Sequence, residues 1–566
     1  MARIFDEMAD LMEISGENPF RIRSYRNAAR TLDGLTRDIH DLLKNEDDIT
    51  SLPGIGKNIA QKIREIADTG KLRQLEELKK KVPESLIDIM NLEQLGPQRT
   101  RLLNSQLGIK SISDLKKAVE EGKLEKIRGF GKKTSENIKR GIREYSSRGG
   151  SKRIKWSDAE MYIQPLLRYL GLKLENVIVA GSYRRKEETV GDIDILATSR
   201  NPEQGMDEFV KYEDTERIIN KGKTKTSVKL RRGLQVDLRI VDTKAYGAAL
   251  LYFTGSKAHN IALRKIGQAK KLKINEYGVF KNEKRIAGKT EKEIYKLLGM
   301  SYIEPEMREN RGEIKLAEMG KLPKLVTLED IRGDLQTHTN ETDGRYSLEE
   351  MAGEAEKFGY EYYAVTDHSK RVSMAHGLDE KRLAGQIEKI DELNRKMKRL
   401  RILKSIEVDI LEDGKLDLPD SILKELDLVV CAVHYNRNLS KEKQTTRILK
   451  AMDNPYFNIL AHPTGRLLNE RNAYAVDMER IMREAVKNGC FLEINSQPDR
   501  LDLNDNYIRM ARDLGLRLAI STDAHTTGNL GYMKYGIAQA RRGWLEKKDV
   551  INTYPWHKLK KLLKRK

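Results

Sequence analysis

The sequence predicts a multidomain protein of the α+β and α/β classes, and three observations lead to this fold class. The chain has 566 residues, enough for three or more domains. Its first 145 residues read as amphipathic helices separated by a glycine turn that recurs three times. The middle contains apolar strands that carry carboxylates, and in the last third apolar strands that end in polar residues alternate with helices. This last pattern is typical of a (β/α) barrel, which we expect here in distorted form.

The composition favours a polyanionic partner, most simply nucleic acid. The formal net charge is +20 and the sequence pI is near 9.4. Hydrophobic residues make up 39% of the chain, which allows packed cores and excludes wholesale disorder.

The same composition gives expectations about location. No apolar run reaches the length of about 18 residues that a membrane span needs, and Met1–Asp6 lacks the apolar core of a signal peptide. Cys431 and Cys490 each lie beside an apolar run and read as small buried residues of a reducing cytosol. We therefore expect a cytoplasmic protein without a membrane partner. The sequence does not reveal the oligomeric state, and a monomer is the working expectation.

The three glycine turns of the first domain predict contacts with the DNA backbone. They lie in segments 52–60, 92–99 and 127–134, each between two amphipathic helix patterns. A turn that opens a helix aims free N–H groups outward, and these bind phosphate without reading sequence. The middle copy has Gln94 where the others have glycine, so it is the weaker one. The candidate DNA-binding glycines are Gly54, Gly56, Gly96, Gly129 and Gly131.

Upstream of these turns, Asn18–Arg26 concentrates arginine around the aromatic Tyr25. One interpretation is a solvated start of a basic helix. The functional interpretation is a DNA contact that includes Tyr25.

Three aspartates in the middle of the chain predict a two-metal site. Asp192 and Asp194 lie in an Asp-x-Asp pattern on an apolar strand, whose alternation sends both side chains to one face. Such close carboxylates repel each other unless divalent cations neutralise them, and oxygen ligands suit Mg²⁺ or Mn²⁺. Asp237, on the later strand 234–241, can complete a site for two ions.

A turn just before the aspartate pair predicts a triphosphate site. Gly181 and Ser182 offer backbone N–H groups and a hydroxyl, and Arg185 offers charge-assisted hydrogen bonds. Beside two metal ions, this turn supplies what the transfer of a nucleotide requires.

Histidines cluster in the last third of the chain. Six of the nine lie between His338 and His525, and five of these six close or directly follow an apolar strand. With three carboxylates they form a candidate metal-ligand set: His338, Asp343, His368, Glu407, His434, His462, Asp523 and His525. Mixed imidazole and carboxylate ligands favour Zn²⁺, Mn²⁺ or Fe over Mg²⁺. His376 fits this pattern less well and stays unassigned.

The Gly-Ser-x9-Asp-x-Asp pattern resembles the nucleotidyltransferase superfamily, and Tyr252-Phe253-Thr254-Gly255-Ser256 narrows the resemblance to family X DNA polymerases over residues 1–315. This resemblance implies in-line attack of a primer 3′-hydroxyl on an α-phosphate, with both ions held by Asp192 and Asp194 and the catalytic one also by Asp237. The other roles that it implies are triphosphate contacts for Ser182, Arg185 and the Gly191 backbone, sugar contacts for Tyr252, Phe253 and Gly255, a base-edge position for Asn260, a template contact for Arg264, a rearranging arginine for Arg239, and a Schiff-base nucleophile for Lys62.

The last third resembles a PHP (polymerase and histidinol phosphatase) domain, as fused to many bacterial and archaeal family X polymerases. The segments Ala461–Arg466 and Ser521–His525 carry the resemblance. It implies that the eight candidate ligands hold metal and that the domain hydrolyses phosphoesters, often as a 3′–5′ exonuclease or on blocked 3′ ends. One departure is Gln336, where the first motif usually has histidine. An amide is a poor substitute for imidazole on Zn²⁺, so one of three ions is expected to bind weakly.

Together these features predict cofactors, partners and domain limits. We expect two Mg²⁺ or Mn²⁺ ions at the polymerase site, two to three Mn²⁺ or Zn²⁺ ions at the PHP site, and gapped or nicked DNA and dNTPs as partners. The stretch 146–152 reads as a linker. The expected domains are a lyase-like 5′-phosphate-binding domain (1–80), a helix-hairpin-helix domain (81–148), a nucleotidyltransferase palm (149–247), a thumb (248–315), a linker (316–330) and a PHP domain (331–566).

Two alternatives remain at this point. In the first alternative, the chain is a nucleotidyltransferase that acts on RNA ends or small molecules. The Tyr252–Ser256 segment and the glycine turns argue against it. Alternatively, the polymerase is retained and the PHP domain is a non-hydrolytic scaffold, which Gln336 favours.

Overall fold

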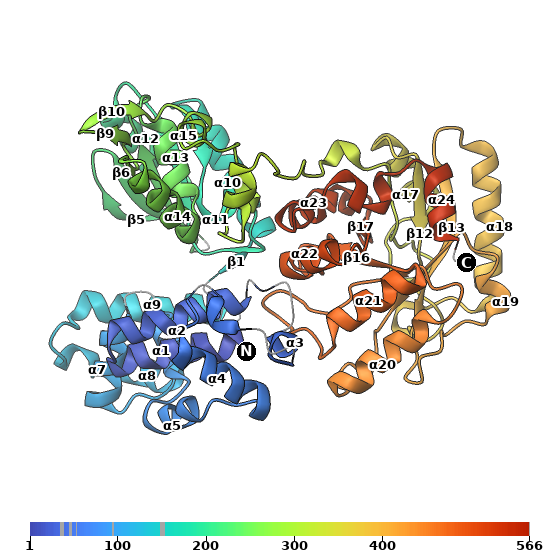
Figure 1. The fold of residues 1–566 in the computed structure, drawn as a ribbon, viewed down its shortest axis with the longest axis horizontal. Coiled ribbons are helices and arrows are strands. Elements are labelled where there is room, and N and C mark those ends of the chain that lie inside the picture. Colours follow the sequence, from blue (N-terminus) through green and yellow to red (C-terminus); the bar gives the residue numbers. More distant parts are fainter. Residues whose placement is uncertain are drawn as a thin grey trace. The chain divides into compact units, whose positions relative to one another are not determined.

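The chain folds into two units in the computed structural model, Met1–Ile154 and Lys155–Lys566 (Figure 1). The structure describes residues 1–33, 35, 39–44, 48–52, 54–92, 95–147, 153–231 and 233–564. Gln94 and most of the predicted linker 146–152 lie outside these residues.

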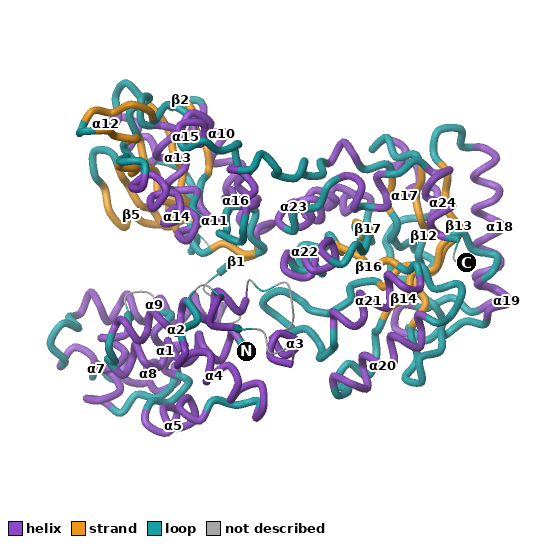
Figure 2. The backbone as a smooth tube through the Cα atoms, in the orientation of Figure 1, coloured by secondary structure: helices purple, strands orange, loops and turns teal. Residues whose placement is uncertain are grey.

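The first unit is helical, as the sequence predicts, and Figure 2 shows its described part as helices joined by loops. Each helix buries one apolar stripe; in α4, Ile59, Ala60, Ile63 and Ile66 face the core at helical spacing. The helices are α1 (Ala2–Ser15), α2 (Pro19–Asp33), α3 (Ile39–Lys44), α4 (Lys57–Thr69), α5 (Arg73–Lys81), α6 (Leu86–Met90), α7 (Pro97–Leu107), α8 (Ile112–Glu120) and α9 (Lys132–Ser147).

The second unit begins with a five-stranded sheet in the order β2-β4-β7-β6-β5. Neighbouring strands pair antiparallel except β4 and β7, which run parallel. The elements of this part are β1 (Ile154–Lys155), α10 (Trp156–Gly171), β2 (Glu175–Val179), α11 (Gly181–Arg184), β3 (Thr189–Val190), β4 (Ile193–Thr198), α12 (Pro202–Val210), β5 (Thr215–Lys221), β6 (Lys225–Leu230) and β7 (Gln235–Ile240).

A smaller helical part with a three-stranded antiparallel sheet follows. Its own apolar cluster centres on the fully buried residues Val279, Ile294 and Tyr295. Its elements are α13 (Tyr246–Thr254), α14 (Lys257–Ala269), β8 (Lys273–Asn275), β9 (Gly278–Lys281), β10 (Lys284–Ala287), α15 (Glu291–Leu297) and α16 (Glu313–Glu318).

The last part is a seven-stranded parallel sheet in sequential order, β11 to β17. The sheet curls until the segments after its first and last strands meet. There, the N–H of His338 donates to the carbonyl of Ala524 (2.8 Å), and the N–H of Asp523 donates to the carbonyl of Gln336 (2.9 Å). The predicted (β/α) barrel is thereby confirmed. Its strands are β11 (Gly333–Asp334), β12 (Tyr362–Val365), β13 (Arg401–Asp409), β14 (Leu428–Ala432), β15 (Ile459–Leu460), β16 (Phe491–Asn495) and β17 (Leu518–Ser521).

Helices cover the outer face of this barrel, and a C-terminal helix lies at the amino ends of its strands. Asn458, just before β15, donates to the carbonyl of Leu563 (2.8 Å), and Glu361, just before β12, accepts from the N–H of Trp556 (2.9 Å). The carboxyl ends of the strands therefore remain for a site. The helices are α17 (Leu348–Lys357), α18 (Glu380–Lys396), α19 (Asp420–Leu423), α20 (Lys441–Met452), α21 (Met478–Asn488), α22 (Asp505–Asp513), α23 (Met533–Arg542) and α24 (Trp556–Leu563).

Two further expectations concern the chain as a whole. None of the helices that the structure describes combines the length and apolar character needed to cross a bilayer. Cys431 and Cys490 are buried and form no disulfide among the described residues, as their apolar neighbours predict.

The seam that closes the barrel predicts a pH-dependent stability. Asp334 accepts a hydrogen bond from the N–H of Thr522 (3.0 Å), and burial raises the pKa of this carboxyl to about 7. The folded state thus binds one more proton than the unfolded state between about pH 4 and pH 7, and the free energy of unfolding falls by up to about 1.4 kcal/mol per pH unit as pH rises through this range. Asp334→Asn stays neutral, so its thermal midpoint should fall less than that of the wild type between pH 5 and pH 8. Parallel midpoint curves for the two proteins would contradict this account.

Candidate functional site

The glycine turns of the first unit have the geometry that the repeat predicts. Gly54 and Gly129 adopt positive φ values of 78° and 95°, which side chains rarely tolerate. Gly56 and Gly96 are the N-cap residues of α4 and α7, and Gly131 directly precedes α9. A Cβ atom added to Gly56, Gly96, Gly129 or Gly131 would meet no described atom within 4 Å, so each helix start is open to an approaching backbone.

Tyr25 requires a correction. Its side chain is 4% exposed, its hydroxyl donates to Gln74 Oε1 (2.7 Å), and its ring lies 5.8 Å from that of Phe5. The predicted DNA contact through Tyr25 is therefore wrong, because helical periodicity turns this residue into the core. The exposed aromatic of the segment is Phe20, at 74%. Lys62 lies half-buried on α4.

The parallel pairing of β4 with β7 places two of the three aspartates side by side. Asp194 and Asp237 are direct partners in the register of this pair. Asp192 lies one residue before β4 and is exposed. Chain positions 194 and 237 thus meet through strand pairing, which the alternation of a single strand does not reveal.

Opposing influences set the charges of these two carboxylates. Burial, together with the negative charge of Asp192, raises the pKa of Asp194 to about 6. Burial also acts on Asp237, but hydrogen bonds from Lys225, Gln235 and Ser227 outweigh it and lower its pKa. Lys225 Nζ lies 2.9 Å from Asp237 Oδ2. The sheet thus presents one ionised and one partly protonated carboxylate, and an arriving cation favours ionisation of both.

Arg239 lies beside Asp194 and Asp237 and not on an exposed surface that could face DNA. Its Nε is 3.8 Å from Asp194 Oδ1, its Nη2 is 3.9 Å from Asp237 Oδ2, and its guanidinium carbon lies 4.2 Å from the centre of the Phe253 ring. This position agrees with the expected arginine near the second acid. It does not support a direct contact with DNA in this conformation.

The candidate triphosphate turn leads from β2 into the short helix α11. Gly181 has φ of 64°, and a Cβ atom there would lie 3.3 Å from Asp194 Oδ2, so glycine brings the turn against the acidic strand. Ser182 is half-buried and the backbone of Gly191 lies two residues before β4. Arg185 Nε donates to Glu309 Oε1 (3.0 Å), which holds its guanidinium beside the turn.

Tyr252 of the aromatic segment lines a small pocket together with Asn260 and Arg264 of the following helix. Asn260 Nδ2 donates to the carbonyl of Tyr252 (2.7 Å), and the rings of Tyr252 and Phe253 lie 5.1 Å apart, edge to face. Gly255 ends α13 with φ of 72°. Arg264 lies on the wall of a cavity of about 600 Å³ formed with residues of α14 and strands β8 and β9.

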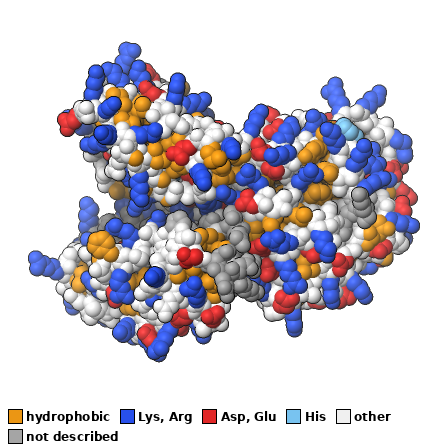
Figure 3. Space-filling model, in the orientation of Figure 1, with side chains coloured by type: hydrophobic (Ala, Val, Ile, Leu, Met, Phe, Trp, Pro, Cys, Tyr) orange, Lys and Arg blue, Asp and Glu red, His pale blue; other side chains and the backbone are white. Residues whose placement is uncertain are grey.

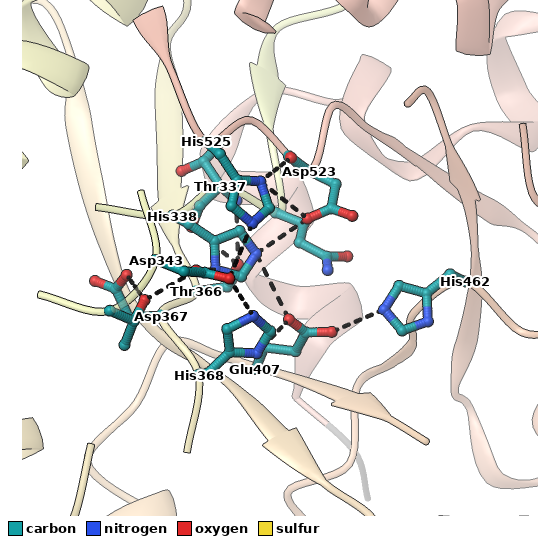
Figure 4. Close-up of polar contacts among 12 residues, drawn as sticks. Thr337, His338, Asp343, Thr366, Asp367, His368, Glu407, His462, Asp523 and His525 are labelled. Atoms are coloured by element: carbon teal, nitrogen blue, oxygen red, sulfur yellow. Dashed lines mark hydrogen bonds and ion pairs between the residues drawn. The ribbon is translucent and has the colours of Figure 1, made fainter. Parts of the chain in front are cut away.

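The second candidate site occupies the carboxyl ends of the barrel strands (Figure 4). His338 follows β11, His368 follows β12, Glu407 lies on β13, and His434 follows β14. His462, Asp523 and His525 follow β15 and β17, and Asp343 comes from the loop before α17. The structure brings all eight predicted ligands to one end of the barrel.

Glu407 is the centre of this cluster. The side chain is 1% exposed and contacts four imidazoles: His368 Nδ1 (3.1 Å), His462 Nε2 (3.0 Å), His434 Nε2 (3.4 Å) and His338 Nε2 (3.5 Å). A carboxylate with two oxygens facing several imidazoles can bridge two cations.

Two further carboxylates, Asp343 and Asp523, complete the cluster around His338. Asp343 Oδ2 lies 3.3 Å from His368 Nε2 and 3.4 Å from His525 Nε2. Asp523 Oδ1 lies 3.0 Å from His338 Nε2, and the ring of His525 stacks on that of His338 at 4.3 Å. Within the described residues, two sets have ligand atoms that all lie within 4.8 Å of one another: His338, Asp343, His368 and His525; and His368, Glu407 and His434.

Buried carboxylates set the charge state of the imidazoles. Although burial opposes it, Asp523, Glu407 and Asp343 raise the pKa of His338 to about 10. Glu407 and Asp409 likewise raise the pKa of His434 to about 9. Burial and the neighbouring Arg500 lower the pKa of His462, which keeps its ring neutral. The cluster thus carries strong negative potential, which favours divalent cations.

Three residues that the sequence analysis missed support the ligands. Asp409 Oδ1 accepts from the backbone N–H of His434 (3.0 Å) and lies 3.2 Å from its Nδ1. Glu493 Oε2 accepts from the N–H of His462 (2.7 Å), and Asn495 Nδ2 donates to Glu493 and to Asp523 Oδ2 (3.0 Å). Alternation was the available signal, since Asp409 follows Glu407 by two residues on β13, and Glu493 and Asn495 are the polar residues of β16.

Gln336 stands where the usual motif has histidine, two residues before His338. Its side chain is 1% exposed, and neither its Oε1 nor its Nε2 has a hydrogen-bond partner among the described residues. A buried amide without partners is costly unless a ligand completes it.

The residues present fit divalent metal ions. Five imidazoles and three carboxylates at hydrogen-bonding distances form a nitrogen and oxygen donor set suited to Mn²⁺, Zn²⁺ or Fe. His376 lies outside these sets; its carbonyl accepts from Arg382.

Family models match most of the first 309 residues. A helix-hairpin-helix domain matches residues 1–72, a SAM-like helix-hairpin-helix tandem 70–144, a DNA polymerase beta palm 157–255 and a DNA polymerase beta thumb 249–309.

Curated relatives match the whole chain or its C-terminal part. The DNA polymerase/3′-5′ exonuclease PolX of Bacillus subtilis (strain 168) is 36% identical over 573 aligned positions, which cover 100% of this chain and 98% of that protein. A probable phosphatase of Thermoanaerobacter sp. (strain X514) is 31% identical over 244 residues, 41% of this chain and 94% of that protein. A probable phosphatase of Acetivibrio thermocellus is 30% identical over 207 residues, 35% of this chain and 81% of that protein.

The charge state of the histidine cluster predicts proton release on metal binding. At pH 8 the metal-free chain carries protons on His338 and His434, whose pKa values are about 10 and about 9. A metal ligand must give up its proton, so Mn²⁺ binding should release at least one proton and should tighten as pH rises from 7 to 9. Titration calorimetry in buffers of different ionisation enthalpy measures this number, and His338→Gln should lower it. A binding heat independent of the buffer would contradict the prediction.

Proposed function

Because the chain belongs to the family X DNA polymerases that carry a C-terminal PHP domain, we propose that it fills short gaps in DNA during repair and trims or cleans 3′ ends. The observation that supports nucleotide transfer best is the register of β4 and β7, which makes Asp194 and Asp237 neighbours beside Asp192. DNA and dNTPs are the partners of this activity, and divalent cations are its cofactors.

At the polymerase site, the residues of the chain divide the work of nucleotidyl transfer. Asp192 and Asp194 would hold both Mg²⁺ or Mn²⁺ ions, and Asp237 would hold the catalytic one and take up the proton of the primer 3′-hydroxyl. When bound, such ions supply charge stabilisation for the attacking and leaving oxygens. Ser182, Arg185 and the N–H of Gly191 would grip the β- and γ-phosphates, so that most of the acceleration comes from positioning.

The incoming nucleotide and the template would lie along α13 and α14. Tyr252, Phe253 and Gly255 would pack against the sugar, and Asn260 would lie near the base edge. Arg264 borders the cavity of about 600 Å³, and it would contact the template strand from there. Lysine and arginine side chains are spread over the face shown in Figure 3, which suits binding through backbone phosphates.

At the PHP site, the eight ligands would hold two to three Mn²⁺ or Zn²⁺ ions. The reaction proposed for this site is the cleavage of a phosphoester at a 3′ end. When bound, such ions supply a nucleophile at neutral pH. Glu407 would hold metal from the centre of the set, Asp409 would orient the imidazole of His434, and Glu493 would fix the backbone at His462. The eight imidazoles and carboxylates that meet at one end of the barrel support hydrolysis over the scaffold alternative, even though Gln336 replaces one usual ligand.

Other assignments remain proposals on sequence grounds. They are the Schiff-base role of Lys62, a monomeric state, a cytoplasmic location, and the domain limits at 80, 148, 247, 315 and 330. The two buried thiols agree with a reducing compartment.

Separate loss of the two activities would test the proposal. On labelled DNA with a one-nucleotide gap and Mn²⁺, Asp192→Asn/Asp194→Asn should lower extension by about 10³-fold or more, because it removes the shared ligands of both ions. The same variant should still shorten 3′ ends. His338→Ala should show the reverse pattern. Wild-type protein that extends but never shortens a 3′ end would make the PHP domain a scaffold, and absence of extension would refute the polymerase assignment.

Restoring the usual ligand would test the interpretation of Gln336. Gln336→His should raise the number of Mn²⁺ or Zn²⁺ ions retained per chain after dialysis, because imidazole is the stronger donor for these ions. Elemental analysis of the full chain measures this number. His376→Gln, which alters a histidine outside the ligand cluster, is the matched control and should leave it unchanged. An equal metal content in Gln336→His and wild type would show that position 336 does not face a metal ion.

A further inference from the structure

The candidate triphosphate turn is bonded to the barrel through Glu188. This residue lies between Arg185 and Asp192, and its carboxylate accepts two hydrogen bonds from one guanidinium: Arg466 Nη2 to Oε1 (2.6 Å) and Arg466 Nη1 to Oε2 (3.1 Å). The side chains are 24% and 14% exposed, so the pair is largely removed from water. A paired fork of this kind fixes orientation as well as distance.

Arg466 itself belongs to the loop that starts at the PHP ligand His462. The loop is held in shape by Asp502, whose Oδ2 accepts from the N–H groups of Thr464 and Gly465 (both 2.9 Å). The guanidinium that holds Glu188 therefore belongs to a loop that is itself hydrogen-bonded to the rim of the barrel.

Arg542, at the end of α23, makes a second connection. Its Nη1 donates to the backbone carbonyl of Arg185 (2.9 Å) and to Glu309 Oε1 (3.2 Å), and its Nη2 donates to Asp505 Oδ2 (2.7 Å). Glu309 also accepts from Arg185 Nε (3.0 Å). Arg542 thus holds the backbone of Arg185 directly. It also holds the guanidinium of Arg185 indirectly, through the carboxylate of Glu309 that both arginines share.

Aromatic packing supports the same connection. The Trp156 ring lies 5.3 Å from that of Tyr535 on α23 and 5.9 Å from that of Tyr183 in the turn, edge to face in both cases. The backbone N–H of Trp156 donates to the backbone carbonyl of Glu188 (3.0 Å). Charged and aromatic contacts therefore tie the turn 183–188 to the barrel along its length.

We propose that Arg466 and Arg542 of the PHP domain are positioning residues for nucleotide binding at the polymerase site. Their guanidinium groups hold the turn that carries Ser182 and Arg185 in the conformation that receives the β- and γ-phosphates of a dNTP. This inference rests on the proposed triphosphate role of that turn. It gives the PHP domain a part in polymerisation that does not depend on its own hydrolysis.

The physical reason is the cost of leaving a buried charge without its partner. Without Arg466, Glu188 keeps a carboxylate in a poorly hydrated place and draws the turn toward another cation. Without Arg542, Glu309 and Asp505 lose a shared cation, and Glu309 then holds Arg185 more tightly and away from phosphate. Either change weakens the binding of the nucleotide, while the aspartates that perform the chemistry stay in place.

Steady-state filling of a one-nucleotide gap by the full chain would test this. Arg466→Met and Arg542→Met should each raise the KM for the incoming dNTP by roughly tenfold, with kcat within about twofold of wild type. Arg466→Lys and Arg542→Lys keep the positive charge and disturb folding less. Their KM values should lie between those of the wild type and of the Met variants. Arg480→Met is the matched control, because Arg480 pairs with Glu442 on the barrel surface, and its KM should not change.

A double-mutant cycle isolates the Glu188–Arg466 pair. Because the double change removes both buried charges, Glu188→Met/Arg466→Met should have a KM closer to wild type than the product of the two single effects. A KM within twofold of wild type in all four Arg466 and Arg542 variants would overturn the inference. Arg185→Ala separates the two proposals: an unchanged KM there would refute the triphosphate role of the turn itself, whereas a raised KM there with unchanged Arg542 variants would refute only the positioning role.

Discussion

Parallel pairing of neighbouring strands is the constraint on which both sites depend. When two parallel strands pair, residues of equal height become neighbours and their carboxyl ends meet at one edge. In the palm-like sheet this makes Asp194 and Asp237 direct partners. In the barrel, the same rule repeated over seven strands brings imidazoles and carboxylates from residue 338 to residue 525 around Glu407.

Gathered carboxylates then determine the chemistry. In the palm-like sheet, burial and the charge of Asp192 raise the pKa of Asp194 to about 6, and Lys225 partly neutralises Asp237. In the barrel, His338 and His434 take up protons, as their raised pKa values show. Both sites thus carry an excess of negative charge that divalent cations satisfy better than protons or lysine, because a double charge at short range offsets more repulsion. The proposed function uses this arrangement for nucleotidyl transfer in one site and for phosphoester hydrolysis in the other.

Buried ion pairs give the second unit its internal order. Arg466 with Glu188, and Arg542 with Asp505 and Glu309, connect residues up to 278 positions apart in the chain. Such pairs add little net stability, since desolvation offsets their attraction, but they are specific in geometry. Their value here lies in fixing the turn that carries Ser182 and Arg185. The polymerase and PHP parts are for this reason coupled at the level of a few side chains.

The sequence by itself determined the classes of element and the kinds of ligand. Strand alternation predicted that Asp192 and Asp194 share a face, although Asp192 lies one residue before β4. Apolar runs ending in histidine predicted the barrel, and glycines marked the helix starts, because these are local properties of the backbone. Tertiary structure alone decided that Tyr25 is buried, that Glu407 is the central carboxylate, that Asp409 and Glu493 orient histidines, and that Arg466 meets Glu188. Contacts of this second kind join distant parts of the chain, and no local pattern encodes which buried charge will face which partner.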